Sequence, residues 1–277
     1  MAPPLDPEVL RAALVTRGSG WTEVEHHDSI GSTNARATRL GRPWVVVVAD
    51  HQSAGRGRLA RRWDAPPGRS VAVSATVPVP ASGAGWLPLL TGLAVTEAVE
   101  ATTSLAAVLK WPNDVLLPSD DDRKVSGILC EVVTARAGPL VVIGAGINVS
   151  QSRAQLPVET ATSLLLAGAR VTESTGTDLV VAYLQRLADR YAALVEAPVT
   201  GGALAGPTGL SGLAAEYRTR CSTLGRRVRM TRAETNGAID VVGVAVDIDA
   251  EGRLVIDGPG GPTAWAAGDV VHVRLDG

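Results

Sequence analysis

A run of six apolar residues, 44–49, ends at Asp50 and is followed by a strongly basic segment, residues 51–63. The run has the composition of a buried strand, so the basic segment leaves a sheet as a loop. More than half of the segment consists of two glycines, four arginines and a closing indole: Gly55, Gly57, Arg56, Arg58, Arg61, Arg62 and Trp63. Glycine lets a backbone approach a ligand closely, and guanidinium groups match phosphate and carboxylate. The segment predicts an anion-binding loop, although taken alone it is more typical of a solvated basic turn or a weak nucleic-acid patch.

The rest of the chain limits which anion-binding proteins come into question. Its 277 residues, 45% of them hydrophobic, predict one large domain and a smaller one. A formal net charge of −2 excludes an overall field that attracts polyanions, so any basic site is local. Cys130 and Cys221 lack metal-ligand spacing and predict no disulfide framework. With no signal peptide and no run of membrane-spanning length, we expect a cytoplasmic protein without a membrane segment.

Lysine is almost absent from the chain, and its two copies lie close together. Of 26 basic side chains, 24 are arginines, and Lys110 and Lys124 are 14 residues apart. An ammonium group is compact and can follow a moving negative charge, so we expect at least one lysine to act chemically. Residues 106–117 read as a strand interrupted at 111–114, and residues 125–133 as the next strand. We therefore expect the two lysines on neighbouring strands of a hairpin.

Helical and strand patterns alternate up to residue 220 and then change. Strands are expected at 21–26, 70–77 and 140–143, and helices at 34–40, 87–101 and 178–196, with a short first helix capped by Asp6. Beyond a glycine-rich stretch and a short helix at 213–220, the pattern becomes strand and turn only. We predict a boundary at residue 220, with a larger domain over 1–220 and a small β-barrel over 221–277.

Three polar or glycine-rich stretches each have an ordinary structural explanation. The serine, threonine and asparagine at 32–34 suit a helix N-cap as well as a polar head group held near a helix start. The break at 111–114 is expected to expose Asn113 and Asp114, and a lone aspartate there is more often a turn residue. The glycines of 144–148 match no nucleotide-loop spacing and are expected to allow two backbones to pack closely.

Together, five stretches occur in the order found in one enzyme family: Gly31-Ser-Thr-Asn34, Ala49 to Arg58 continuing to Trp63, Lys110-Trp-Pro-Asn-Asp114, Lys124-Val-Ser-Gly-Ile-Leu129 and Gly144-Ala-Gly-Ile-Asn148. The chain resembles the biotin protein ligases. The resemblance implies an α+β fold of the class II synthetase type: a mixed, mainly antiparallel sheet flanked by helices, followed by a small SH3-like barrel. It also implies that biotin and ATP form biotinyl-5'-adenylate, with Mg²⁺, and that biotin then passes to a lysine of a biotin carboxyl carrier domain.

The resemblance assigns residues to each part of this reaction. Catalytic groups would be Lys124, Arg58, Arg56 and Asp114, because joining a carboxylate to an α-phosphate requires charge neutralisation in the transition state. Ser32, Thr33 and Gln52 would hold the ureido ring, and Gly127, Ile128 and Leu129 would support the apolar part. The full biotin-binding set is Ser32, Thr33, Asn34, Gln52, Gly55, Arg56, Gly57, Arg58, Lys124 and Gly127. ATP would be bound by Arg58, Arg61, Trp63, Asn113 and Asn148, with Trp63 as the platform for adenine.

Two departures from the family pattern stand out. Ala60 replaces a glycine of the basic loop, which would cost about 1 kcal/mol if that position requires a positive φ. Only about 20 residues precede Trp21, too few for the DNA-binding domain of repressor members, so no DNA partner is expected. Lys110 is equally suited to a structural salt bridge, and the sequence allows a homodimer without requiring one. The alternatives are a lipoate or octanoate ligase and a non-catalytic nucleic-acid-binding protein.

Overall fold

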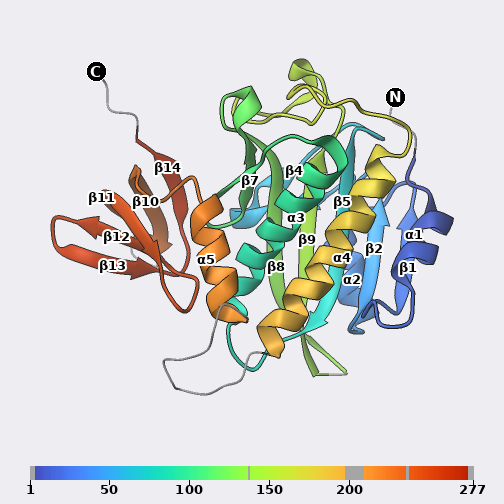
Figure 1. Ribbon diagram of the computed structural model, residues 1–277, viewed down its shortest axis with the longest axis horizontal. Helices are drawn as coiled ribbons and strands as arrows, with labels where there is room; N and C mark the ends of the chain where they lie inside the picture. The colour runs from blue at the N-terminus through green and yellow to red at the C-terminus, as the bar shows by residue number, and fades with distance from the viewer. Residues whose placement is uncertain (1–3, 137, 197–208, 235–236, 274–277) are drawn as a thin grey trace.

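The computed structural model describes residues 4–136, 138–196, 209–234 and 237–273, and a seven-stranded sheet forms its larger part (Figure 1). The strand order is β1-β2-β5-β9-β8-β7-β6. β1 and β2 are parallel, and every other neighbouring pair is antiparallel. The bounds are Glu23–His27 (β1), Val45–Ala49 (β2), Ser70–Pro78 (β5), Gly138–Asn148 (β9), Arg123–Ala135 (β8), Asp114–Leu117 (β7) and Val108–Lys110 (β6). The expected mixed, mainly antiparallel sheet is confirmed.

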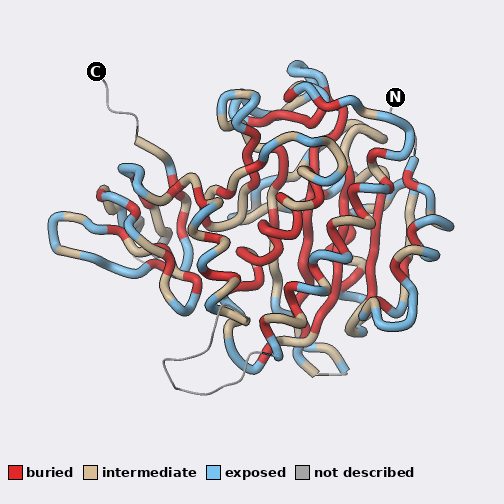
Figure 2. Tube along the Cα trace, viewed as in Figure 1, coloured by how far each residue is buried: buried red, intermediate tan, exposed pale blue. Residues whose placement is uncertain are grey.

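Helices cover both faces of this sheet because its central strands are apolar on both sides. In β2, Val46 and Val48 belong to the large core, which also contains residues of α3 (Leu87–Thr103) and α4 (Thr175–Val195). Val47 points the other way and packs with Ala37 of α2 (Thr33–Leu40). This alternation follows from the two-residue period of a strand. Figure 2 shows the strands β2, β5 and β9 as mostly buried behind α3 and α4.

The remaining helices lie at the two ends of the sheet. α1 (Pro7–Leu14) begins at Asp6, whose carboxylate accepts hydrogen bonds from two backbone N–H groups of the first turn, as expected for an N-cap. α5 (Leu210–Arg220) leads to the second sheet. Short 3-10 turns are η1 (Arg58–Ala60), η2 (Ala84–Trp86), η3 (Pro118–Asp120) and η4 (Arg153–Gln155). Among the described residues, no helix combines the length and the apolar character needed to cross a membrane.

The C-terminal part is a five-stranded antiparallel sheet in the order β13-β12-β11-β10-β14. Its strands are Arg227–Glu234 (β10), Gly237–Ile248 (β11), Leu254–Gly258 (β12), Gly261–Trp265 (β13) and Asp269–His272 (β14). The sequence pattern predicts short strands at 228–230, 238–248, 254–256 and 270–275, so β13 is an additional strand. The last four residues of the chain, which include the end of the strand expected at 270–275, lie outside the described part. In the described residues no pairing joins β13 to β14. The domain boundary at residue 220 stays a prediction.

The two sheets are fixed to each other by two buried tryptophans. Trp86 Nε1 donates to the carbonyl of Ala250 at 2.8 Å, and Trp111 Nε1 donates to that of Gly252 at 3.1 Å. Both acceptors lie in the turn between β11 and β12. A Cβ at Gly85 would lie 2.3 Å from the carbonyl oxygen of Glu251, so only glycine allows this approach.

One expectation about the lysines is wrong. Lys110 ends β6 and Lys124 lies in β8, but β7 runs between these strands. The residues at 111–113 reverse the chain, so the segment predicted as one interrupted strand forms two paired strands. The second of them, β7, takes the place beside β8.

His272 makes the structure sensitive to acid. Burial, with the nearby charges of Lys110 and Arg226, lowers the pKa of His272 from 6.5 to about 4. Between these values the unfolded chain binds more protons than the folded one, so stability falls as pH decreases from 6.5 to 4. We expect urea denaturation to show that His272→Gln reduces the loss of stability between pH 7.5 and pH 4.5 by about 1 to 2 kcal/mol, after allowance for partial exposure. His51→Gln is the control, because the side chain of His51 contacts Ser29 at an exposed position. An equal reduction of the stability loss in His51→Gln would contradict the assignment to His272.

Candidate active site

A cavity of about 540 Å³ lies over one face of the main sheet, lined in part by residues of β5, β8 and β9. Its walls come from the start of α2, the basic segment, strands β7 to β9, residues 157–161 and Asp269 of β14. Six cationic side chains line it against three carboxylates: Arg56, Arg58, Arg61, Arg62, Lys110 and Lys124 against Asp64, Asp114 and Asp269. Its size is that of a small-molecule site, and its charge favours an anion.

One end of the cavity is a cluster of uncharged polar groups at the start of α2. Ser32 caps this helix, and its Oγ accepts from the N–H of Ala35 at 3.4 Å. The N–H of Thr33 donates to Gln52 Oε1 at 2.7 Å, and Thr33 Oγ1 lies 3.0 Å from the same oxygen. Ser32 is therefore an N-cap, as the residue types at 32–34 suggested, and it also lines the cavity.

Behind this end lies a second row of polar groups. Ser74 Oγ, which is fully buried, lies 2.7 Å from Thr33 Oγ1 and 2.6 Å from Asn34 Oδ1. Asn34 Nδ2 donates to Glu131 Oε2 at 2.7 Å. A chain of contacts thus runs from Gln52 at the cavity to Glu131 on β8.

Glycines make room for three cavity side chains. A Cβ at Gly144 would lie 2.2 Å from Asn34 Oδ1, and one at Gly146 would lie 2.4 Å from Cε2 of Trp63. At Gly127 a Cβ would lie 2.9 Å from Lys124 Nζ and 3.0 Å from the Trp63 ring. The glycines of β9 therefore admit side chains, and the expected close packing of two backbones there is wrong.

Lys124 stands next to a carboxylate and an indole. Its Nζ lies 2.6 Å from Asp114 Oδ1 and 5.9 Å from the ring centre of Trp63. Lys110 is paired with Asp114 across β6 and β7. Burial lowers the pKa of Lys110, and the negative charge of Asp114 opposes that shift. Asp114 is thus the shared counter-ion of two lysines, and both it and Asn113 are partly buried rather than exposed.

The arginines of the basic segment point in different directions. Arg56 Nη2 lies 3.5 Å from Glu131 Oε2 at an exposed position. Arg58 donates to Asn113 Oδ1 at 3.0 Å and to the carbonyl of Gly268 at 3.4 Å, and burial lowers its pKa. Arg61 is ion-paired with Asp269. Two of the arginines therefore connect the loop to the C-terminal sheet.

The backbone of the loop is held as a narrow hairpin. β3 (Gly55–Arg56) pairs with β4 (Arg62–Trp63), and a Cβ at Gly55 would lie 2.4 Å from the carbonyl oxygen of Trp63. Between them, Leu59 has a positive φ of 55°. Leu59, one position before Ala60, is therefore a left-handed residue of this loop, and the conformational cost expected for Ala60 stays a prediction.

The two asparagines expected at the nucleotide are already hydrogen-bonded. Asn113 Nδ2 donates to the carbonyl of Ile128 at 2.9 Å while its Oδ1 accepts from Arg58. Asn148 Nδ2 donates to the carbonyl of Thr162 at 2.9 Å, and its Oδ1 accepts from Gln151 at 2.7 Å. Each amide retains one N–H, and each also holds part of the cavity wall in place.

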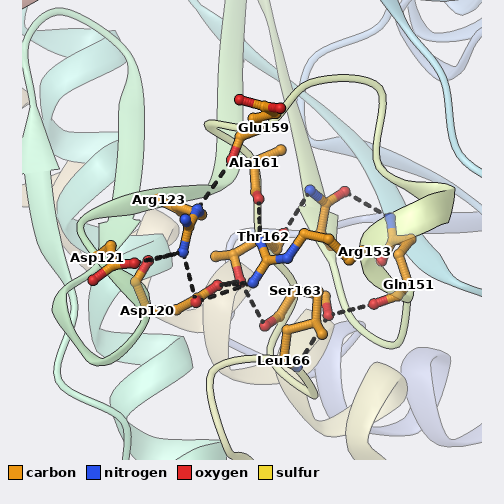
Figure 3. A network of polar contacts seen from close by, with 11 residues as sticks. Asp120, Asp121, Arg123, Gln151, Arg153, Glu159, Ala161, Thr162, Ser163 and Leu166 are labelled. Carbon is orange, nitrogen blue, oxygen red and sulfur yellow. Dashed lines mark hydrogen bonds and ion pairs between the residues drawn. The ribbon is translucent and has the colours of Figure 1, made fainter.

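Asp120 organises the outer wall, residues 153–162 (Figure 3). Its carboxylate accepts from Arg123 at 2.9 Å, from Arg153 at 2.8 Å and from the hydroxyl of Thr162. Burial raises the pKa of Asp120, but the hydrogen bonds from Thr162 and Arg153 outweigh this and lower it overall. Backbone bonds of 2.8 Å from Lys124 N to Thr160 O and from Thr162 N to Lys124 O attach this wall to Lys124. The hydrogen bonds that hold the outer wall in place therefore also fix the backbone of Lys124.

With one exception, the structure brings every predicted site residue to the cavity. Gly55 is the exception, because it does not line the cavity but pairs with Trp63 between β3 and β4. Sequence reasoning missed Asp269, Ser74, Glu131 and the wall at 157–161. No local signal identified them, since an aspartate at the start of a strand or a serine within one is ordinary.

A group with metal-ligand spacing lies outside the cavity. His26, Asp28 and Asp50 have ligand atoms within 4.8 Å of one another. However, His26 Nε2 is already 2.8 Å from Asp50 Oδ2, and Asp50 Oδ1 accepts from the N–H of Leu5. These are the contacts of a structural pair.

Comparison with known proteins identifies relatives over almost the whole chain. Residues 31–148 match the biotin/lipoate A/B protein ligase family, and residues 223–273 match the biotin protein ligase C-terminal domain. A biotin acetyl-CoA-carboxylase ligase of Mycobacterium tuberculosis is 39% identical over 99% of this chain and 98% of its own length. A biotin protein ligase from Aquifex aeolicus in complex with biotin and ATP has a TM-score of 0.72 at 24% identity, covering 92% of this chain and all of that one. One from Leishmania major in complex with biotinyl-5-AMP has a TM-score of 0.59 at 20% identity, covering 92% of this chain and 99% of that one.

Asp120 is expected to keep the outer wall closed. In Asp120→Asn the charge is lost and an NH₂ group meets Arg153 or Arg123, which we expect to weaken the wall by about 1 to 3 kcal/mol. Hydrogen exchange of the amides at 153–162 should then be about 10- to 100-fold faster, with α4 unchanged. Asp121→Asn is the matched control because Asp121 is exposed and contacts only Arg123 within this network. Equal exchange in the two variants would show that Asp120 does not support the wall.

Proposed function

The chain belongs to the biotin protein ligase family, and we propose that its cavity joins biotin to ATP and passes the biotin to a carrier protein. In the first step a biotin carboxylate oxygen attacks the α-phosphorus, biotinyl-5'-adenylate forms and pyrophosphate leaves. In the second, the amine of a carrier lysine attacks the acyl carbon, the acyl–oxygen bond breaks and AMP leaves. The observation that carries this proposal is the meeting of Lys124, Asp114 and the arginines of residues 56–62 in one cavity.

The cationic half of the cavity suits the adenylation step. Two anions must approach each other, and negative charge accumulates on the phosphate oxygens in the transition state. Lys124, Arg56 and Arg58 are proposed to neutralise that charge. Asp114, 2.6 Å from Lys124 Nζ, orients the ammonium group, so the lysine can stabilise the reacting phosphate first and the departing AMP later.

The uncharged polar end suits the ureido ring of biotin. This ring offers N–H donors and a carbonyl acceptor but no net charge. Ser32 Oγ accepts from Ala35 and keeps its own proton, which it can donate to the ureido oxygen. Thr33 and Gln52 supply oxygens for the N–H groups, and Gly127, Ile128 and Leu129 provide the surface for the apolar rings.

The opposite end is proposed to hold the nucleotide. The ring of Trp63 occupies the space above Gly127 and Gly146, and its Nε1 is buried without a hydrogen-bond partner in the described residues. We propose it as the platform for adenine, with the remaining N–H groups of Asn113 and Asn148 at the base edge and Arg61 at the phosphates. Residues of the wall at 157–161 line the same cavity, and the neighbouring Thr162 accepts from Asn148.

Mg²⁺ is proposed to enter with ATP. Magnesium is usually held by one or two carboxylates together with substrate phosphates. Asp114 uses Oδ1 for Lys124, so its Oδ2 fits this role or assists the incoming carrier lysine. When bound, the ion would neutralise charge on the phosphates of ATP.

The two alternatives are less well supported. A lipoate ligase would share the match at 31–148, but the match at 223–273 is to a biotin protein ligase domain. A nucleic-acid-binding protein would present its arginines on an open surface, whereas Arg58 is partly buried and hydrogen-bonded to Asn113. The carrier domain is the proposed partner, and a homodimer stays a prediction.

Replacement of Lys124 tests the chemical assignment. In Lys124→Ala we expect biotin-dependent exchange of pyrophosphate into ATP to fall by about 100-fold or more, because a charge-stabilising donor is lost. Transfer of labelled biotin to a carrier domain should fall at least as far. Lipoate should not replace biotin in the wild-type reaction.

A control separates this effect from general damage. Arg39→Ala removes a cation at the exposed end of α2 and should retain activity within about twofold. Near-normal adenylate synthesis by Lys124→Ala would refute the role of Lys124, and a wild-type protein without exchange activity would refute the proposed function.

A further inference from the structure

The polar end of the cavity contains fewer protons than its contacts require. Three short oxygen–oxygen contacts link Asn34, Ser74, Thr33 and Gln52, with separations of 2.6, 2.7 and 3.0 Å. The oxygens of Asn34 and Gln52 carry no proton, so only the hydroxyls of Ser74 and Thr33 can donate. Two protons cannot serve three contacts, and one pair of oxygens faces each other without a hydrogen bond.

Glu131 decides which contact lacks the proton. Its carboxylate, close to Arg56, can only accept, so the 2.7 Å bond from Asn34 turns the NH₂ group toward Glu131 and Oδ1 toward Ser74. Ser74 then gives its single proton to Asn34, because 2.6 Å is the shortest of the three contacts. Thr33 in turn gives its proton to Ser74, because 2.7 Å is shorter than the 3.0 Å contact to Gln52.

The contact left without a proton lies at the cavity. Gln52 Oε1 accepts the backbone N–H of Thr33 at 2.7 Å, which fixes its orientation, and both side chains line the cavity. Two acceptor oxygens therefore lie 3.0 Å apart on residues that line the cavity. A ligand N–H placed at them removes the repulsion, whereas a ligand oxygen or methylene leaves it.

We propose that Glu131, acting through Asn34 and Ser74, is a positioning residue that makes this end of the cavity require an N–H donor. This inference rests on the proposed binding of the ureido ring at the same end. It adds that the selectivity for a ureido N–H is set by two residues that do not line the cavity, Ser74 and Glu131. The class of ligand it favours is a cyclic urea or amide rather than an ester, carbonate or thioether ring.

Glu131→Gln reverses the hydrogen bonds with almost no change in shape. Asn34 can then turn its carbonyl toward the new amide and its NH₂ toward Ser74. Ser74 donates to Thr33 and Thr33 donates to Gln52, so all contacts are satisfied without a ligand. Ser74→Ala breaks the same relay behind Thr33 without touching Arg56, and so separates the relay from the Glu131–Arg56 pair.

The test measures binding of biotin and of its two cyclic carbamate analogues, in each of which one ureido N–H is replaced by oxygen. Calorimetry on the full chain should show that wild type binds at least one carbamate about 10-fold more weakly than biotin, the effect of one lost hydrogen bond and an exposed acceptor pair. In Glu131→Gln and in Ser74→Ala this ratio should fall to about threefold or less. ATP binding and the turnover number at saturating biotin should change by less than about twofold.

Three further results complete the test. Glu173→Gln, an exposed carboxylate away from the cavity, should keep the wild-type ratio. The double variant should show the same ratio as either single variant, because both break one relay. An unchanged ratio in both single variants would overturn the proposal. If wild type bound no biotin, the proposed function would fail instead.

Discussion

The cavity depends on the absence of three side chains from two adjacent strands. Gly127 of β8 is paired directly with Gly146 of β9, and Gly144 lies two residues away on the same face. In each case a functional side chain occupies the place of the missing Cβ: Lys124 and Trp63 at the paired glycines, and Asn34 at Gly144. Any other residue at these positions would displace a group that the proposed chemistry needs. The sheet can line the floor of the cavity because it carries no side chains at these three positions. The stability of the sheet comes from its apolar strands, such as β2 and β5.

Charge is arranged around this floor so that the two ends differ in kind. At the start of α2 neutral amides and hydroxyls are ordered by a buried relay, and among the charged side chains of the cavity arginines and lysines outnumber the carboxylates. A molecule with a neutral polar ring at one end and an anionic group at the other fits only one way round. Such an arrangement orients a substrate before any reaction begins, and part of the catalytic advantage of an enzyme comes from this kind of orientation.

Much of this could be predicted from the sequence, where function requires a recognisable local pattern. The basic loop, the Lys110 to Asp114 stretch and Lys124 were all assigned to one site, and the helix-capping role of Asp6 and Ser32 followed from residue type. The strand order was harder. Lys110 and Lys124 were placed on neighbouring strands because nothing local indicated that β7 would pair between them.

Residues that act at long range gave no local signal. Ser74 and Glu131 look like ordinary strand residues until the sheet places them behind the start of α2, and Asp120 looks like part of a hydrophilic turn until Arg153 and Thr162 meet it. The glycines of β9 were interpreted as a backbone contact because a sequence does not reveal what fills the space above a glycine.

Asp269 lies in the C-terminal sheet, yet it lines the cavity and pairs with Arg61. Because a ribosome makes the chain from its N-terminus, the basic loop and Lys124 emerge long before their last neighbour does. The nascent polypeptide can build the main sheet early but cannot complete the substrate chamber until translation has passed β14. A newly made molecule would thus acquire a finished chamber only after Asp269 has been synthesised and the two sheets joined by the tryptophans have come together.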